Sequence, residues 1–331
     1  MDLVDIYTLI DEDLKHVQQN IQNTLNTQLT PENSAILTHI LASQGKMIRP
    51  ILIFLCGYAI EHPLSPEKHT KLIQAATAIE LIHIASLVHD DVIDDADRRR
   101  NTSSIKGKFG NSSAVTTGTL LYSIALQQIA ETGSLKLLKE ISKTVQTMCE
   151  GELLQEAIKQ SKNYSVNDYY KVIESKTAVL FKTASLTSSI LFSFPKPIET
   201  AFTTYATLLG YAFQLSDDYL DIFGTEEALN KKIGQDLTQG CLTLPIIETL
   251  NTLKKDHKTG ILNAINTQDT KTLTDFIKTV KTPSINKKTN AIITSHIQEA
   301  KKALENINNN TFKQSLNVLA DCIHERINNT N

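Results

Sequence analysis

The same acidic pattern, DDxxD, occurs twice in this chain. It is formed by Asp90, Asp91 and Asp94 in HDDVIDD, and again by Asp217, Asp218 and Asp221 in LSDDYLD. Residues four apart on a helix lie on one face, so each pattern directs two carboxylates the same way with a third beside them. Three carboxylates within about one turn repel one another unless a cation neutralises them.

A hard divalent cation suits such clusters. Mg²⁺ in proteins is usually held by one or two carboxylates, and water and substrate phosphate oxygens fill its other positions. A single DDxxD is weak evidence, because acidic residues near helix ends are commonly solvated or act as caps. Here both copies continue apolar helical stretches, LIHIASLVHDD and YAFQLSDDYLD, and are expected to emerge from the core. The pair therefore indicates metal-assisted diphosphate chemistry.

Three arginines, Arg98, Arg99 and Arg100, follow the first cluster. Arginine binds phosphate through a planar, permanently charged guanidinium, so this run suits an anionic ligand. The plainer alternative is a surface ion-pair run, and the acids that would face these arginines are Asp94, Asp95 and Asp97. Taken alone, the run favours the plainer alternative.

A second basic element is the segment GKMIRP, which contains Lys46 and Arg49. Pro50 follows Arg49 at once, which predicts a bend or a helix start, where backbone N–H groups can meet an anion. The alternative is an ordinary helix N-terminus with exposed basic side chains.

The composition favours a helical protein with a large core. The 331 residues are 41% hydrophobic and 21% charged, and only 12 Gly and 8 Pro interrupt them. The net charge of −3 offers no general attraction to nucleic acid. The four cysteines form no CxxC, so we expect reduced thiols and a cytoplasmic protein. The acidic N-terminal segment predicts no signal peptide, and no apolar run is expected to reach membrane-spanning length.

Helical periodicity is nearly continuous and predicts a single all-helical domain over residues 1–331. We expect a large bundle with a small helical appendix after Pro245. The predicted helices cover residues 4–24, 31–43, 48–61, 67–91, 116–131, 135–160, 166–192, 198–223, 246–254, 270–280, 286–306 and 310–327.

From about Gly45 to Pro245 the chain resembles the trans-polyprenyl diphosphate synthases, and among them the long-chain, octaprenyl-type enzymes. The resemblance rests on motifs in a specific order: GKMIRP, HDDVIDDADRRR, Gly110–Asn111, EGELLQ, SKTAVLF, FQLSDDYLD and GQDLTQGCLTLP. It implies an all-α, isoprenoid-synthase-type large helical bundle around a central cavity. It also implies Mg²⁺-dependent transfer of an allylic prenyl group to isopentenyl diphosphate, with the proton lost to the released diphosphate.

The resemblance implies a role for each site residue. All six cluster carboxylates act in catalysis, and the metal ligands are expected among Asp90, Asp91, Asp94 and Asp217. The allylic substrate is expected to contact Arg99, Lys176, Thr177, Gln214 and Lys231. Isopentenyl diphosphate is expected to contact Lys46, Arg49, His83 and Arg100. A lone His is more often structural, but His83 lies seven residues before Asp90, two turns back on the same helix face.

Four positions depart from the family pattern. Met47 replaces a common Arg, Asn101 a Gly, Thr119 an Asp and Cys241 a Lys. The change at Cys241 removes a cation near the allylic diphosphate, and the change at Thr119 removes an anion near the first cluster. Both would lower the rate or mark a subunit that works only with a partner, but neither is an expected metal ligand.

The helix before Asp90 bears on product length. One helical turn is about 5.4 Å, close to one extended isoprene unit. Short-chain members of the family carry bulky aromatics four or five residues before the first Asp, where this chain has Ser86 and Ala85, with Ile82 one turn further back. The small residues predict a long product of about seven to nine isoprene units, centred on octaprenyl diphosphate for quinone side chains.

Three alternatives stay open. They are a short-chain farnesyl or geranylgeranyl diphosphate synthase, a weakly active subunit of a heteromeric synthase, and a terpene cyclase, which the intact second cluster argues against. The expected partners are isopentenyl diphosphate, an allylic prenyl diphosphate and a second copy of the chain in a homodimer. No nucleic acid and no transmembrane segment are expected.

Overall fold

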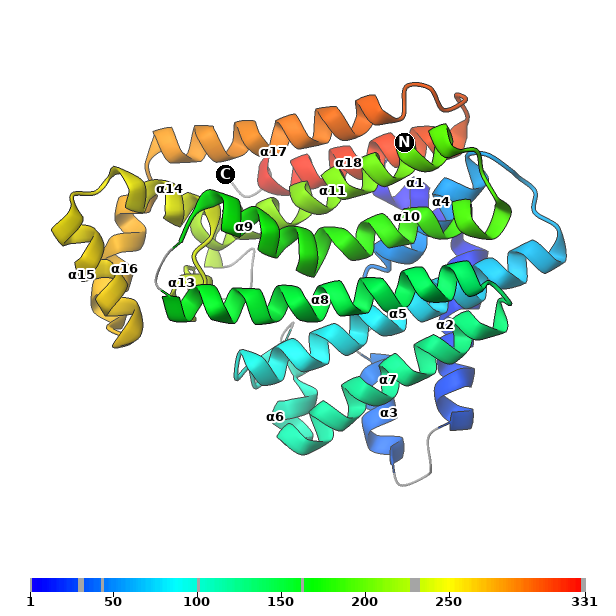
Figure 1. The fold of residues 1–331 in the computed structure, drawn as a ribbon, viewed down its shortest axis with the longest axis horizontal. Coiled ribbons are helices and arrows are strands. Elements are labelled where there is room, and N and C mark those ends of the chain that lie inside the picture. Colours follow the sequence, from blue (N-terminus) through cyan, green and yellow to red (C-terminus); the bar gives the residue numbers. More distant parts are fainter. Residues whose placement is uncertain are drawn as a thin grey trace. The chain divides into compact units, whose positions relative to one another are not determined.

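The chain folds almost entirely into α-helices, as a computed structural model shows (Figure 1). The structure describes residues 2–28, 33–42, 45–99, 102–161, 164–226 and 233–328. The prediction of an all-α fold is confirmed. The backbone divides into two compact units; unit 1 comprises Met1–Val145, Leu180–Thr204 and Leu304–Val318, and unit 2 comprises Gln146–Val179, Tyr205–Ala303 and Leu319–Asn331. The single domain over residues 1–331 stays a prediction.

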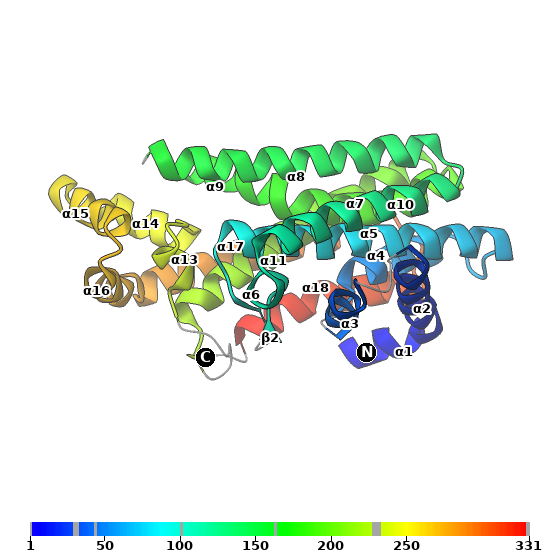
Figure 2. The same cartoon turned by 90° about the horizontal axis from the view of Figure 1, so that it is seen from below.

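Unit 1 is built around the helix that carries the first acidic cluster, α5 (Pro66–Ile93). Its other elements are α1 (Leu3–Leu9), α2 (Asp11–Gln28), α3 (Ser34–Ala42), α4 (Ile48–Tyr58), β1 (Arg98–Arg99), β2 (Thr102–Ser103), α6 (Ile105–Phe109), α7 (Asn111–Glu131), the first part of α8 (Leu135–Ser161), most of α10 (Val179–Phe192), the start of α11 (Lys196–Phe223) and the start of α18 (Thr311–Asn328). Helix α3 packs on α6, and α2 packs on α5 (Figure 2).

Helix α5 begins where its sequence predicts. Ser65 caps it by accepting the Lys68 N–H, and Pro66 takes the first turn, where its missing N–H costs nothing. Helices α5 and α7 lie side by side (Figure 1) and meet closely at Gly118. A Cβ on Gly118 would stand 2.3 Å from Nε2 of His89, so a side chain here would force the imidazole to move.

Among the described residues, α5 is the one helix long and apolar enough to cross a membrane by length and composition. This corrects the expectation that no apolar run reaches that length. However, 61% of its most apolar stretch is buried. A core helix of a folded domain passes the same test, so the lack of a transmembrane segment stays a prediction.

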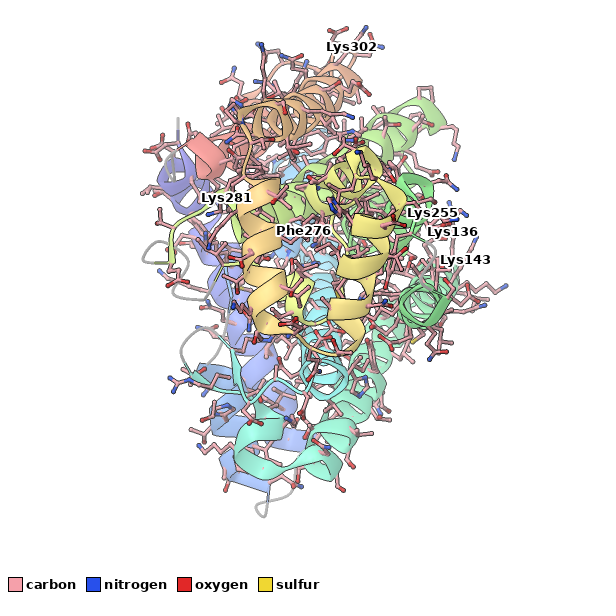
Figure 3. All side chains as sticks on the ribbon, turned by 90° about the vertical axis from the view of Figure 1, so that its left-hand side faces the viewer. Lys136, Lys143, Lys255, Phe276, Lys281 and Lys302 are labelled. Atoms are coloured by element: carbon pink, nitrogen blue, oxygen red, sulfur yellow. The ribbon has the colours of Figure 1, made fainter. Side chains whose placement is uncertain are left out.

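Unit 2 carries the second acidic cluster on the C-terminal part of α11. Its other elements are the second part of α8, α9 (Val166–Ile173), the π-helical turn η2 (Glu174–Ala178), α13 (Gln235–Thr238), α14 (Leu244–Thr252), α15 (Lys255–Asn266), α16 (Thr270–Val280), α17 (Pro283–Ala303) and the end of α18. Helices α15 and α16 pack on each other with Phe276 buried, whereas Lys255, Lys281 and Lys302 are exposed to solvent (Figure 3).

Most predicted helices are present, with several differences. The stretch 4–24 is two helices that meet at Ile10, and α7 begins at Asn111 rather than Thr116. The stretch 166–192 is interrupted by η2. The hairpin β1–β2 and the short helices α6 and α13 were not predicted, because elements of two to five residues are too short to show periodicity. The polar helix α15 was not predicted either.

Candidate active site

The first acidic cluster ends helix α5. Asp94 is the C-cap residue, and its N–H donates to the Asp90 carbonyl. Asp91 is only 4% exposed, and its Oδ1 accepts from Nε of Arg99 at 2.9 Å. Burial raises the pKa of the Asp91 carboxyl, and the guanidinium of Arg99 opposes that rise. Asp90 and Asp94 are half-buried. The buried acid thus has a cationic partner in the protein.

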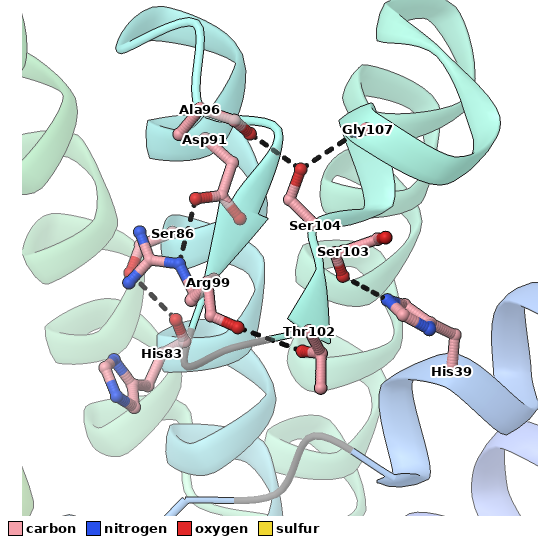
Figure 4. A network of polar contacts seen from close by, with 10 residues as sticks. All are labelled: His39, His83, Ser86, Asp91, Ala96, Arg99, Thr102, Ser103, Ser104 and Gly107. Carbon is pink, nitrogen blue, oxygen red and sulfur yellow. Dashed lines mark hydrogen bonds and ion pairs between the residues drawn. The ribbon is translucent and has the colours of Figure 1, made fainter. Parts of the chain in front are cut away.

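Arg99 reaches Asp91 from the short hairpin β1–β2 (Figure 4). Thr102 Oγ1 donates to the Arg99 carbonyl at 2.9 Å. Ser104 closes the hairpin, since its Oγ donates to the Ala96 carbonyl at 2.7 Å and accepts the Gly107 N–H at 2.9 Å. These bonds fix the backbone that carries the guanidinium.

The remaining acids of this segment pair with a lysine. Nζ of Lys106 lies 2.5 Å from Asp95 and 2.8 Å from Asp97. Asp95 and Asp97 therefore pair with Lys106, and the interpretation of the arginines as an ion-pair run stays a prediction. Arg100 and Asn101 lie outside the described residues.

A pocket of about 180 Å³ in unit 1 gathers three of the predicted site residues, His83, Asp91 and Arg99. Its polar lining also includes Glu80, which is 4% exposed, and His39, whose Nε2 lies 2.7 Å from the Ser103 carbonyl. The apolar part of the lining comes from Ile40, Ala42, Ile84, Leu87, Val88 and Ile105. The pocket thus combines a guanidinium, two carboxyl groups and two imidazoles with apolar walls.

The segment GKMIRP starts helix α4, as predicted. Met47 is its N-cap residue in a left-handed conformation, with φ of 52°. The hydroxyl of Tyr7 donates to the Lys46 carbonyl at 2.6 Å. Arg49 is 9% exposed and its guanidinium lies over the ring of Phe181, 4.9 Å from the centroid. The alternative of exposed basic side chains is therefore wrong for Arg49, which is buried and stacked.

The proposed chain-length residues lie on the central turns of α5. Ile82 and Ala85 are fully buried in unit 1. Ser86 is half-buried, and its hydroxyl donates back to the His83 carbonyl at 2.9 Å. Their role in product length stays a prediction.

In the second cluster, Asp218 lies in a network that also includes Gln214 and Thr177. Oδ2 accepts from the Tyr169 hydroxyl at 2.6 Å, and Oδ1 accepts from Gln214 Nε2 at 2.8 Å. Thr177 Oγ1 in turn donates to Gln214 Oε1 at 2.9 Å. Burial raises the pKa of Asp218 to about 7, although the two hydrogen bonds oppose the rise.

The π-helical turn η2 carries the residues Ser175, Lys176 and Thr177. Such turns within helices occur often at functional sites. A Cβ on Gly151 would lie 2.3 Å from Ser175 Oγ, so the glycine of EGELLQ permits α8 to approach this turn. Lys176 Nζ contacts Glu152 Oε2 at 2.5 Å and Gln155 Oε1 at 3.0 Å. The motif EGELLQ thus positions the lysine.

The two unusual positions Cys241 and Thr119 have separate environments. Cys241 Sγ accepts from Gln155 Nε2 at 3.6 Å, so the residue in place of the family lysine touches the same glutamine as Lys176. Thr119 is exposed on α7, and its hydroxyl donates to the Val115 carbonyl of its own helix. All four cysteines are free thiols, as predicted.

Asp217 and Asp221 differ in their surroundings. Asp221 is fully buried, and its Oδ2 accepts from the Asp236 N–H at 3.3 Å. The Asp217 side chain is 38% exposed and lies 2.6 Å from Nη2 of Arg326. Lys231, a predicted substrate-binding residue, lies outside the described residues.

The donor chemistry fits Mg²⁺, although the described residues hold no group of three or more His, Cys, Asp or Glu side chains placed to bind a metal ion. Mg²⁺ needs only one or two carboxylates when substrate phosphate oxygens and water complete its shell. The half-buried side chains of Asp90, Asp94 and Asp217 are accessible to a cation. The buried Asp91 and Asp218 are already bonded to Arg99, Tyr169 and Gln214.

Sequence reasoning missed Tyr169 and Arg326, which bond to the second cluster from 49 and 109 residues away. No local pattern marks such partners. Glu152 could have been predicted, because it belongs to the motif EGELLQ.

Residues 30–282, more than half of the chain, match the model of the polyprenyl synthetase family. The chain belongs to the polyprenyl synthetase family. It is similar to the heptaprenyl diphosphate synthase component 2 of Geobacillus stearothermophilus, with 36% identity over 76% of this chain and 77% of that protein. It is also similar to the octaprenyl diphosphate synthase of Haemophilus influenzae, with 32% identity over 97% of this chain and 96% of that protein.

Among solved structures, the chain is similar to a polyprenyl synthase from Caulobacter crescentus complexed with calcium and isoprenyl diphosphate. The TM-score is 0.88 at 26% identity, and the match covers 98% of this chain and 97% of that one. These comparisons confirm the predicted family and a prenyltransferase activity.

Proposed function

We propose that this prenyltransferase is Mg²⁺-dependent and condenses isopentenyl diphosphate with an allylic diphosphate to make a long-chain polyprenyl diphosphate. The observation that carries the proposal is the pocket of unit 1, where His83, Asp91 and Arg99 line one space together with apolar side chains. A diphosphate with a hydrocarbon tail needs both kinds of lining.

Each group then has a chemical task. When bound, Mg²⁺ neutralises the negative charge that develops on the departing diphosphate. Arg99 and Lys176 add fixed positive charge, so an allylic cation can form. Lys46, Arg49 and His83 bind isopentenyl diphosphate, whose double bond attacks that cation. The apolar side chains Ile84 and Leu87 keep water from the cation, which water would otherwise quench.

The protein needs no nucleophile and no general base for this reaction. The new carbon–carbon bond forms between the two substrates, and the proton lost from the isopentenyl unit passes to the released diphosphate. Catalysis then rests on orientation and electrostatics, which explains why the site consists of carboxylates and cations held by hydrogen bonds.

The product is expected to be octaprenyl-like, for quinone side chains, because Ala85 and Ser86 are small. A short-chain product is the alternative. A second alternative is a subunit of a heteromeric synthase, and the similarity to a protein named component 2 favours testing it. We further infer a homodimer that works in the cytoplasm, in keeping with the four free thiols.

The test incubates the purified chain alone with isopentenyl diphosphate, farnesyl diphosphate and Mg²⁺, and separates the dephosphorylated products by chromatography. Products of about forty carbons support the proposal, since each turn of α5 accommodates about one unit. Products of fifteen or twenty carbons contradict the long-chain assignment. Products that form only after a second polypeptide is added contradict the assignment as an independent enzyme.

A further inference from the structure

The C-terminal helix α18 supplies a guanidinium to the second acidic cluster. Arg326 Nη2 lies 2.6 Å from Asp217 Oδ1, and Nη1 lies 3.5 Å from Ser216 Oγ. The guanidinium also lies over the ring of Phe213, 5.1 Å from its centroid. Three neighbouring residues of α11 therefore hold one arginine.

Asp217 differs from the other acids of its cluster in its exposure. Asp218 is 4% exposed and Asp221 is fully buried. The carboxyl oxygens of Asp218 accept from Tyr169 and Gln214, and Asp221 accepts from a backbone N–H. The Asp217 side chain is 38% exposed, so it is the carboxylate that a cation arriving from solvent can reach.

We propose that Arg326 occupies the Asp217 carboxylate until a divalent ion binds there, and that the released guanidinium then binds the diphosphate. The proposal rests on the function proposed above, because it assigns Asp217 to the metal. The guanidinium bonds to Oδ1 of Asp217, and a divalent ion on the same carboxylate repels it because both groups are cations in close proximity. Binding of the ion therefore favours release of the guanidinium.

The exchange is energetically easy for two reasons. A half-exposed ion pair is screened by water and contributes little to stability, so it breaks readily. The stacking on Phe213 does not depend on Asp217 and keeps the guanidinium beside the cluster after release. A planar guanidinium binds phosphate oxygens through two parallel hydrogen bonds, whereas a lysine binds them as a point charge.

The first experiment measures Mn²⁺ binding to the full-length protein without substrate by isothermal titration calorimetry. Arg326→Gln removes the competing charge and keeps the side-chain length. We expect Mn²⁺ to bind this variant about fivefold more tightly than the wild type, because the ion no longer displaces a cation. Unchanged or weaker Mn²⁺ binding to a folded variant overturns the proposal.

The second experiment measures binding of inorganic diphosphate in saturating Mg²⁺. Arg326→Gln is expected to weaken this binding about tenfold, through loss of a charge-assisted contact. Arg326→Lys is expected to keep wild-type Mn²⁺ affinity and to lose part of the diphosphate affinity, because it retains charge but lacks the planar fork. Diphosphate affinity that is equal in all three proteins contradicts the release step.

The matched control is Lys301→Gln. Lys301 pairs with both carboxyl oxygens of Asp321 in the same unit, at 2.8 and 2.7 Å, without touching the acidic cluster. Both affinities are expected to stay within twofold of the wild type. If the wild type lacks prenyl transfer but shows the Mn²⁺ competition, the proposed function fails and the competition stands. Prenyl transfer by the wild type without Mn²⁺ competition supports the proposed function and overturns the competition.

Discussion

The hydroxyl of Tyr169 donates a hydrogen bond to the carboxylate of Asp218, and both side chains are buried. The bond links helix α9 to the acidic cluster on α11. It stabilises the charged form of a group whose pKa burial has raised to about 7. Keeping this buried carboxyl charged lowers the stability of the fold.

Asp218→Asn is expected to abolish prenyl transfer and to raise the melting temperature at pH 8 by about 2–4 °C. The pKa of Asp218 is about 7 in the folded protein, above its usual value of 3.8. Between pH 3.8 and about pH 7 the folded protein therefore retains a proton that the unfolded chain releases. The stability of the wild type therefore falls as pH rises toward 7. The difference in melting temperature should shrink at pH 5, and a difference that is the same at both pH values would contradict this account.

Arg99→Gln is expected to lower kcat/KM about a hundredfold, because the variant loses a fixed cation beside the departing diphosphate. It also leaves Asp91, which is 4% exposed, without its 2.9 Å partner. Steady-state kinetics with both substrates check this result. The neighbour Arg98, which is exposed, serves as the control, and Arg98→Gln should retain activity within about twofold. Equal losses in the two variants would argue for a general charge effect.

Tyr7→Phe is expected to raise the KM for isopentenyl diphosphate about fivefold and to leave the KM for the allylic substrate unchanged. The lost bond to the Lys46 carbonyl, worth about 1 kcal/mol, holds the segment that carries Lys46 and Arg49. Tyr58→Phe is the matched control, because it removes a hydroxyl bond to Asp13 in the same unit without touching that segment. A similar change in both KM values for either variant would indicate a structural effect alone.

Ala85→Phe is expected to shorten the product to about fifteen or twenty carbons, since a bulky ring one turn before the cluster closes the path of the chain. Ala76 is equally buried but lies on the opposite face of α5, about 180° away. Ala76→Phe therefore controls for overpacking, which costs about 1–3 kcal/mol at either position. Chromatography of the products of the two variants distinguishes a closed product path from overpacking. Shorter products from both variants would show that the effect is not specific to Ala85.

The sequence was informative about elements with strong periodicity and about residues in ordered motifs. The long helices α5, α8 and α11 lie where apolar periodicity predicted them. His83, Asp91 and Arg99 line one pocket. Their roles were expected from the resemblance to the family, whose motifs occur here in order.

Features that depend on contacts distant in sequence could not be predicted. The π-helical turn η2 packs closely against Gly151, a contact that no local pattern reveals. Tyr169 and Arg326 reach the second cluster from other helices. The pairing of Lys106 with Asp95 and Asp97 depends on a hairpin whose strands are only two residues long.

Metal-dependent elongation is measured by incorporation of labelled isopentenyl diphosphate by the purified chain, with farnesyl diphosphate in Mg²⁺ and again after chelation with EDTA. We expect elongation by the chain alone in Mg²⁺, loss of elongation in EDTA, and recovery when Mg²⁺ is restored. Elongation that continues unchanged in EDTA, or that is absent in Mg²⁺, would contradict the proposed function.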